Sequence, residues 1–76
     1  MYNRLDEVRI KAFGKNLRRI RESKELSLRQ LADEVDMAKS TIERIEMGQV
    51  DTRMTTVARL AAALGIEPGD LFTFPS

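Results

Sequence analysis

The chain is 76 residues long, has a formal net charge of +1 and contains neither cysteine nor histidine. This length suits one domain, near the lower limit at which a hydrophobic core suffices without disulfides or a metal. Because Cys and His are absent, there are no disulfides and none of the common zinc ligands, and we expect no metal and no other cofactor. We also expect no enzyme activity, since carboxylates scattered along helix surfaces cannot form a nucleophile–base pair.

The sequence shows no segment that would enter a membrane or direct export. No apolar run approaches the roughly 18 residues that a membrane-spanning helix needs. The N-terminal stretch "MYNRLDEVRIKAFGK" is charged throughout and has no signal-peptide core. We therefore expect a cytoplasmic protein with no membrane partner.

The small net charge hides an uneven distribution along the chain. Residues 1–24 hold eight Lys or Arg against three acids, residues 25–51 hold three against seven, and residues 52–76 hold two of each. The total charge gives only weak support for a polyanion partner. A solvated helix face is the ordinary interpretation of the basic N-terminal block.

Apolar spacing predicts a first and a second helix in the N-terminal half. A helix from about Leu5 to Ser23 follows from apolar residues at intervals of three and four: Leu5, Val8, Ala12, Phe13, Leu17 and Ile20. Gly14 within it marks either a slight bend or the start of the packed portion. Ser27 is a good N-cap for a second helix of about residues 28–35, which ends before Asp36. Its expected inward side chains are Leu28, Leu31, Ala32 and Val35.

The C-terminal half contains three further predicted helices and no strand. The third lies in "MAKSTIERIEMG", residues 37–48, and is stopped by Gly48. The fourth spans about Met54 to Leu64, with Met54, Val57, Leu60, Ala61 and Leu64 expected to be buried. Pro68 fits the first position of a short last helix, "PGDLF".

The third predicted helix has few apolar residues and a compact polar face. Only Ile42 and Ile45 are firmly apolar in its interior, so one face would remain available for hydrogen bonding. The residues before it satisfy the steric demands of two helices joined by a tight turn: a small side chain at Ala32, a turn at Asp36 and an apolar anchor at Met37. This pattern is far more specific than an ordinary amphipathic pair.

The segment "LSLRQLADEVDMAKSTIERIEMGQVDTRMTTVARLAAALGIEPGDLF" is similar to the Xre/Cro/phage-repressor family of helix-turn-helix DNA-binding domains. The resemblance covers residues 15–72. Residues 1–14 form an N-terminal extension of the first helix, and residues 73–76 a short tail. The family implies an all-α, compact, lambda-repressor-like bundle of five helices, whose third helix enters the major groove of double-stranded DNA.

The resemblance also implies roles for individual residues. Positions 38, 39, 40, 43, 44 and 47 would face outward, and the candidates for base contacts are Ala38, Lys39, Ser40, Glu43 and Arg44. Candidates for phosphate contacts are Ser27, Leu28, Arg29, Thr41, Gln49, Arg53, Thr55 and Thr56. Arg21 and Glu46 match a structural ion pair of the family. For each DNA-contacting candidate, a solvated or capping side chain is the alternative interpretation.

The sequence departs from the family pattern in three places, one of which is Thr52 and Arg53, where a proline and a capping serine are frequent. Asp36 replaces the usual turn glycine and adds negative charge, and Ala38 stands where a Ser or Thr usually caps the recognition helix. The acidic middle segment predicts weak nonspecific binding and strong salt sensitivity.

We expect a sequence-specific transcriptional regulator, a repressor, that binds a palindromic operator as a homodimer. Leu71, Phe72 and Phe74 are the candidate dimer surface, together with the long first helix; closure of the monomer core is the alternative for Leu71 and Phe72. The competing function is an antitoxin-like or adaptor module that keeps the fold and binds protein instead of DNA.

Overall fold

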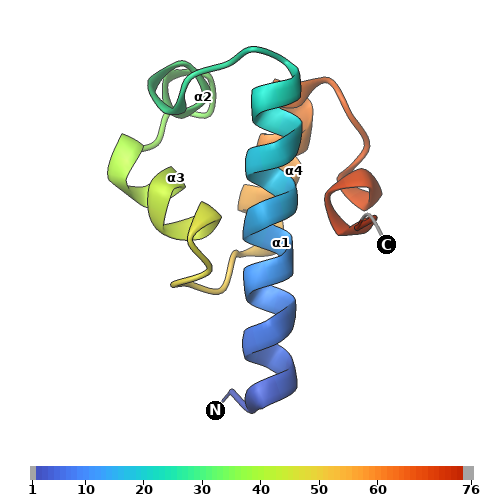
Figure 1. Cartoon of the computed structure of the whole chain (residues 1–76). Helices are drawn as coiled ribbons and strands as arrows, with labels where there is room; N and C mark the ends of the chain where they lie inside the picture. Colours follow the sequence, from blue (N-terminus) through green and yellow to red (C-terminus); the bar gives the residue numbers. More distant parts are fainter. Residues whose placement is uncertain (1, 75–76) are drawn as a thin grey trace.

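A computed structural model describes residues 2–74 and shows an all-α fold with no strand in this range (Figure 1). Its elements are α1 (Arg4–Ser23), α2 (Leu28–Glu34), α3 (Lys39–Glu46), α4 (Met54–Leu64) and the 3-10 helix η1 (Pro68–Phe72). Of the predicted tail 73–76, Pro75 and Ser76 lie outside the described residues. No helix among the described residues is long and apolar enough to cross a membrane.

The helix boundaries follow local capping chemistry. Ser27 caps α2 as predicted: its hydroxyl accepts from the Gln30 N–H, and the Gln30 side chain accepts from the Ser27 N–H. The predicted bounds of α4 are confirmed, and Gly65 ends it in the left-handed region at φ 69°. Asn3 and Asp6 form a second capping box, at the start of α1, which explains why this helix begins so early.

The predicted fifth α-helix is instead a 3-10 helix, so the bundle contains four α-helices and one shorter element. Its five residues lie between Glu67, which caps it, and Thr73, whose backbone is extended. A segment this short closes few i→i+4 hydrogen bonds, and the tighter 3-10 turn is the usual result.

All five elements contribute to one apolar core. Its largest fully buried side chains are Leu17, Leu31, Ile42, Leu60 and Leu71. Leu71 therefore closes the monomer core, the alternative that the sequence left open for it, and does not lie on a dimer surface. The side chain points inward because Asn16, itself only 3% exposed, donates to the carbonyl oxygens of Asp70 and Leu71 at 3.2 and 2.8 Å and holds η1 against α1.

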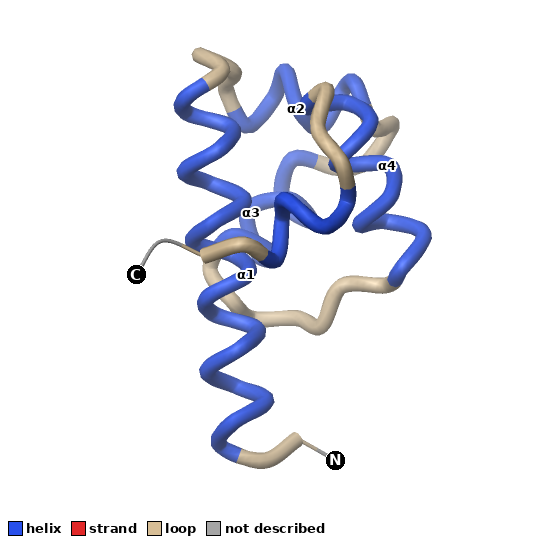
Figure 2. Tube along the Cα trace, turned by 90° about the vertical axis from the view of Figure 1, so that its right-hand side faces the viewer, coloured by secondary structure: helices blue, strands red, loops and turns tan. Residues whose placement is uncertain are grey.

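Three apolar residues expected on packed faces are exposed. Leu5 and Val8 are 53% and 55% exposed, because the first turns of α1 extend beyond the bundle, below the loop that joins α3 to α4 (Figure 2). Met54 is 88% exposed because it opens α4 one turn before Val57, where the buried row of that helix begins. The buried part of α1 starts at Phe13 and Gly14, as the second interpretation of Gly14 predicted.

Candidate nucleic-acid interface

Two short helices joined by a tight turn form the centre of the candidate site. Asp36 takes up the left-handed backbone at φ 56°, so the chain reverses direction at the position predicted for the turn. The N–H of Met37 then donates to the Ala32 carbonyl at 2.9 Å. Ala32 is only 1% exposed on α2, which packs against α3, as expected for the small residue of such a helix pair.

The third helix presents two chemically different faces. Ile42 and Ile45 are 0% and 3% exposed and hold α3 on the core. The opposite face is exposed along its length and carries every side chain predicted to point outward: Ala38, Lys39, Ser40, Glu43, Arg44 and Met47. An eight-residue helix is about 12 Å long, comparable to the width of the major groove of B-DNA.

The N-terminus of α3 lacks a side-chain cap, which gives a first prediction. Ala38 has the extended backbone of an N-cap, but its methyl group leaves the first N–H groups without a side-chain acceptor. We expect Ala38→Ser to raise the free energy of unfolding by about 1 kcal/mol, measured by urea denaturation without DNA. Ala38→Val is the control and should bring no gain. Equal stability of the Ser and Val variants would show that α3 does not depend on this cap.

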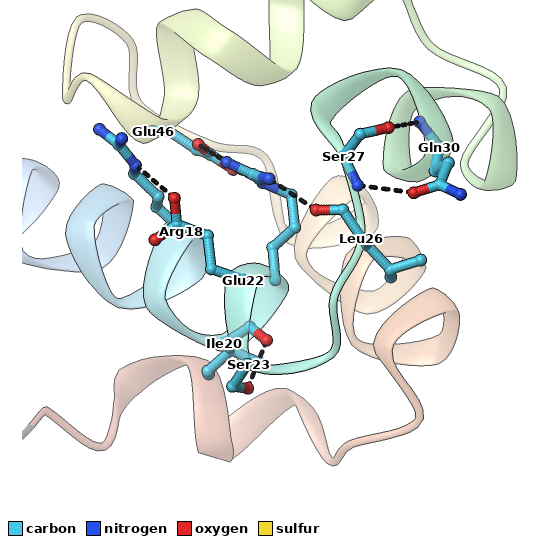
Figure 3. A network of polar contacts seen from close by, with 9 residues as sticks. Arg18, Ile20, Glu22, Ser23, Leu26, Ser27, Gln30 and Glu46 are labelled. Carbon is cyan, nitrogen blue, oxygen red and sulfur yellow. Dashed lines mark hydrogen bonds and ion pairs between the residues drawn. The ribbon is translucent and has the colours of Figure 1, made fainter.

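A buried ion pair fixes the C-terminal end of α3 to α1, as the resemblance implied. Arg21 Nε and Nη2 donate to Glu46 Oε2 and Oε1 at 2.7 and 3.1 Å, and Arg21 Nη1 donates to the Leu26 carbonyl at 2.7 Å (Figure 3). The hydrogen bond to Glu46 raises the pKa of the Arg21 guanidinium, although burial opposes this shift. The Arg21 side chain thus connects α1, the loop before α2, and α3.

The predicted phosphate-contacting residues come from three segments beside α3. Those at the start of α2 are Ser27 and Arg29, which are exposed, and Leu28, which is half-buried. The Ser27 hydroxyl accepts from the Gln30 N–H and can still donate its own proton to an anion, beside the first backbone N–H groups of α2 and the exposed Arg29 guanidinium. Thr41 is half-buried on α3. Beyond α3, Gln49, Arg53 and Thr55 are exposed and Thr56 is half-buried.

Arg18 belongs to this surface although the sequence analysis missed it. It lines a hollow of about 290 Å³ between α1, α2 and α3, together with Arg21, Leu28, Glu43, Glu46 and Met47. Its guanidinium is exposed and donates to Glu22 at 3.2 Å. The sequence spacing could have identified it, because Arg18 precedes Arg21 by three residues and therefore lies on the same face of α1.

The basic N-terminal block is not gathered entirely at this face. Arg19 donates to the side-chain oxygen of Asn16, the residue that holds η1. In Figure 1, η1 and α3 flank α1 on opposite sides. The positive charge of α1 is therefore divided between the α3 side and the η1 side.

Together, the tight turn, the buried isoleucines and the exposed polar face of α3 define a helix-turn-helix DNA-binding domain. Comparison with known proteins agrees, since a family model described as a helix-turn-helix domain matches residues 12–72. The chain belongs to the Xre/Cro/phage-repressor family of helix-turn-helix domains.

Individual relatives cover most of the chain. Control protein C.BamHI of Bacillus amyloliquefaciens is 36% identical over 63 residues, which are 82% of this chain and 78% of that protein. The crystal structure of the restriction-modification controller protein C.AhdI from Aeromonas hydrophila has 36% identity and a TM-score of 0.81, covering 83% of this chain and 96% of that one. The clp gene regulator ClgR from C. glutamicum has 28% identity and a TM-score of 0.77, covering 80% and 79%.

Proposed function

We propose that this chain is a transcriptional regulator that binds double-stranded DNA sequence-specifically as a homodimer and represses from a palindromic operator. The observation that carries the proposal is the exposed polar face of α3, opposite the buried Ile42 and Ile45. Hydrogen-bonding side chains on a helix of this size suit the donor and acceptor pattern that base pairs display in the major groove. Within this proposal, the likeness to the restriction-modification controller protein C.AhdI favours a role in controlling a restriction–modification system.

The outward side chains of α3 can be matched to base chemistry. Lys39, in the first turn, can donate to guanine O6 and N7, whereas the Ser40 hydroxyl suits several bases and specifies little. Arg44, one turn later, can reach a guanine or a phosphate. Glu43 can accept from a cytosine amino group or orient its basic neighbours, and the Ala38 methyl group can contact a thymine methyl group.

Phosphate contacts on both sides would set the register of α3 in the groove. The start of α2 offers the N–H groups of Leu28 and Arg29, and Gln49 and Arg53 follow α3 in the chain. Arg18 joins this group in our proposal, because it lines the hollow beside Glu43 and Leu28. A single small domain makes few base contacts, so a two-fold pair with recognition helices about 34 Å apart is the arrangement that gives useful specificity.

Selection of binding sites from random DNA duplexes, at low and moderate salt, tests the function directly. We expect the parent chain to enrich a palindrome. Lys39→Ala should change the enriched bases and weaken binding to the parent site about tenfold, the effect of losing one good base contact. Arg53→Ala is the matched control: it should weaken binding to all sequences similarly and leave the enriched bases unchanged.

The same selection separates DNA binding from the competing function. If the parent chain prefers no duplex even in dilute buffer, the proposal is wrong and a protein-interaction module is the better interpretation. The low net charge and the acidic residues 25–51 are the features that favour that alternative.

A further inference from the structure

The N-terminal extension of α1 lies beside the loop that follows the recognition helix. The family model begins at residue 12, whereas a capping box starts α1 at Arg4. The first turns of α1 therefore project past the bundle and lie below the loop that joins α3 to α4 (Figure 2). We call residues 47–53 the α3–α4 loop. Two of its residues, Gln49 and Arg53, are candidates for phosphate contacts.

The extension and the α3–α4 loop come into close contact at Gly48. The backbone of Gly48 is in the left-handed region at φ 70°, and a Cβ atom there would lie 2.6 Å from Lys11 Cγ and 2.8 Å from Lys11 Cα. A hollow of about 420 Å³ lies between the two segments, and every residue that lines it belongs to one of them: Tyr2, Glu7, Ile10, Lys11, Gly48, Gln49, Val50 and Asp51.

One hydrogen bond joins the start of the chain to the middle of the loop. The Tyr2 hydroxyl donates to Asp51 Oδ2 at 3.0 Å, across 49 positions of the sequence. Among the residues that the structure describes, it is the only hydrogen bond made by residues 50–52, because backbone hydrogen bonds stop at Gln49 and resume at Arg53. The middle of the α3–α4 loop therefore depends on Tyr2 for its polar anchoring.

Packing alone holds this part of the loop weakly. Val50 is half-buried against the core, but Asp51 is exposed. Residues 50–52 also line a second, apolar hollow of about 300 Å³ with Phe72 and Phe74, which are 56% and 40% exposed and remain candidates for the dimer surface. With two hollows beside it, the loop has few neighbours that limit its movement.

The bond from Tyr2 also determines which partner the Asp51 carboxylate takes. Arg53, two residues further on, is exposed and makes no ion pair with the residues that the structure describes. A free carboxylate at this distance would attract the Arg53 guanidinium and repel a DNA phosphate. Because Tyr2 donates to Asp51, the carboxylate is held towards the start of α1 instead.

We propose that residues 2–11 hold the α3–α4 loop in place for its phosphate contacts, with Tyr2 as a positioning residue that acts through Asp51. We call this contact the N-terminal brace. It limits the movement of residues 50–52 before DNA binds, and it leaves Arg53 free to meet a phosphate. A loop that is already ordered loses less conformational entropy on binding, so its contacts contribute more to affinity. The inference rests on the proposed DNA binding.

NMR relaxation of the full chain without DNA tests the brace itself. We expect backbone order parameters of about 0.85 for residues 50–52 in the parent chain, and in Tyr2→Phe a fall towards the value of about 0.6 that marks a flexible segment. Asp51→Asn keeps a side-chain oxygen that can accept from Tyr2 and should retain the parent values. Ser23→Ala is the matched control: it removes a hydroxyl hydrogen bond at the opposite end of α1 and should change nothing in the loop.

Binding to the selected palindrome tests the effect on DNA recognition. Tyr2→Phe should raise the Kd about two- to fivefold and leave the enriched bases unchanged, since phosphate contacts carry no sequence information. In an Arg53→Ala background the same substitution should change the Kd by less than about 1.5-fold, because the contact through which it acts is already absent. A general loss of structure, or a direct contact of Tyr2 with DNA, would give the same fold-change in both backgrounds.

Two results would overturn the inference. One is a Tyr2→Phe variant with the parent order parameters, and the other is an equal fold-change in Kd with and without Arg53. The order parameters need no DNA, so they report on the brace separately from the proposed function. A parent chain that prefers no duplex would overturn the proposed function, and with it the role of the brace in DNA binding, while the relaxation data would still show whether Tyr2 orders the loop.

Discussion

Replacing Glu46 with alanine is expected to lower the free energy of unfolding by about 3–5 kcal/mol. The substitution leaves the Arg21 guanidinium buried without the carboxylate to which it donates at 2.7 and 3.1 Å. Both side chains are almost completely buried, so water cannot replace the lost partner. For a domain of this size, the loss corresponds to a fall in Tm of at least about 12 °C, measurable by circular dichroism.

The chain contains its own control for this measurement. Arg18 and Glu22 also form an ion pair, at 3.2 Å, but their side chains are 65% and 55% exposed. Glu22→Ala should therefore cost less than about 1 kcal/mol. The double variant Arg21→Met, Glu46→Leu removes both buried charges and should be more stable than Glu46→Ala. Equal midpoints for Glu46→Ala and Glu22→Ala would show that the buried pair contributes nothing to stability.

The buried ion pair and the helix that carries Glu46 show which features of this fold could be predicted from the sequence. Helical spacing was sufficient to predict α3 with Ile42 and Ile45 inward, because a regular helix fixes which residues share a face. The pairing of Arg21 with Glu46, 25 residues apart, came from the family resemblance, since spacing gives no distance between helices.

The errors have one physical cause. Apolar spacing identifies the apolar face of a helix but not whether another element covers it. Leu5 and Val8 continue the stripe of α1 beyond the bundle, and nothing among residues 2–74 buries them. Leu71 is the reverse case: the sequence left a dimer surface and the monomer core open for it, and it packs in the core because η1 folds back and is held by Asn16. The role of Asn16 in holding η1 was not predicted, because a single polar residue in a helix is normally expected to face solvent.

The candidate DNA surface was predictable only in part for the same reason. Residues on α3 itself follow from its helical period, so every predicted outward position is exposed. Arg18 lies on another helix and reaches the hollow beside Glu43 only because α1 and α3 pack together.

Gly14→Ala is expected to destabilise the protein by about 3 kcal/mol, although helix propensity alone predicts a gain of about 1 kcal/mol. A Cβ atom at this position would lie 2.4 Å from the Ile45 carbonyl oxygen and 2.6 Å from that of Glu46. Both neighbours are backbone atoms at the end of α3, so the clash can be relieved only by moving α3 away from α1. Because that movement would displace the recognition helix and stretch the Arg21–Glu46 pair, the affinity for DNA should fall as well.

Gly69→Ala is the matched control for this substitution, because a Cβ atom at Gly69 would meet no atom within 4 Å. It should leave stability unchanged or slightly improved, as the unfolded chain loses conformational freedom. Both variants add one methyl group, so comparing their free energies of unfolding by urea denaturation separates the effect of the clash at Gly14 from the effect of helix propensity. If Gly14→Ala proves as stable as Gly69→Ala, α1 and α3 do not approach as closely as the structure shows. The orientation of α3, on which the proposed reading of DNA depends, would then have to be different.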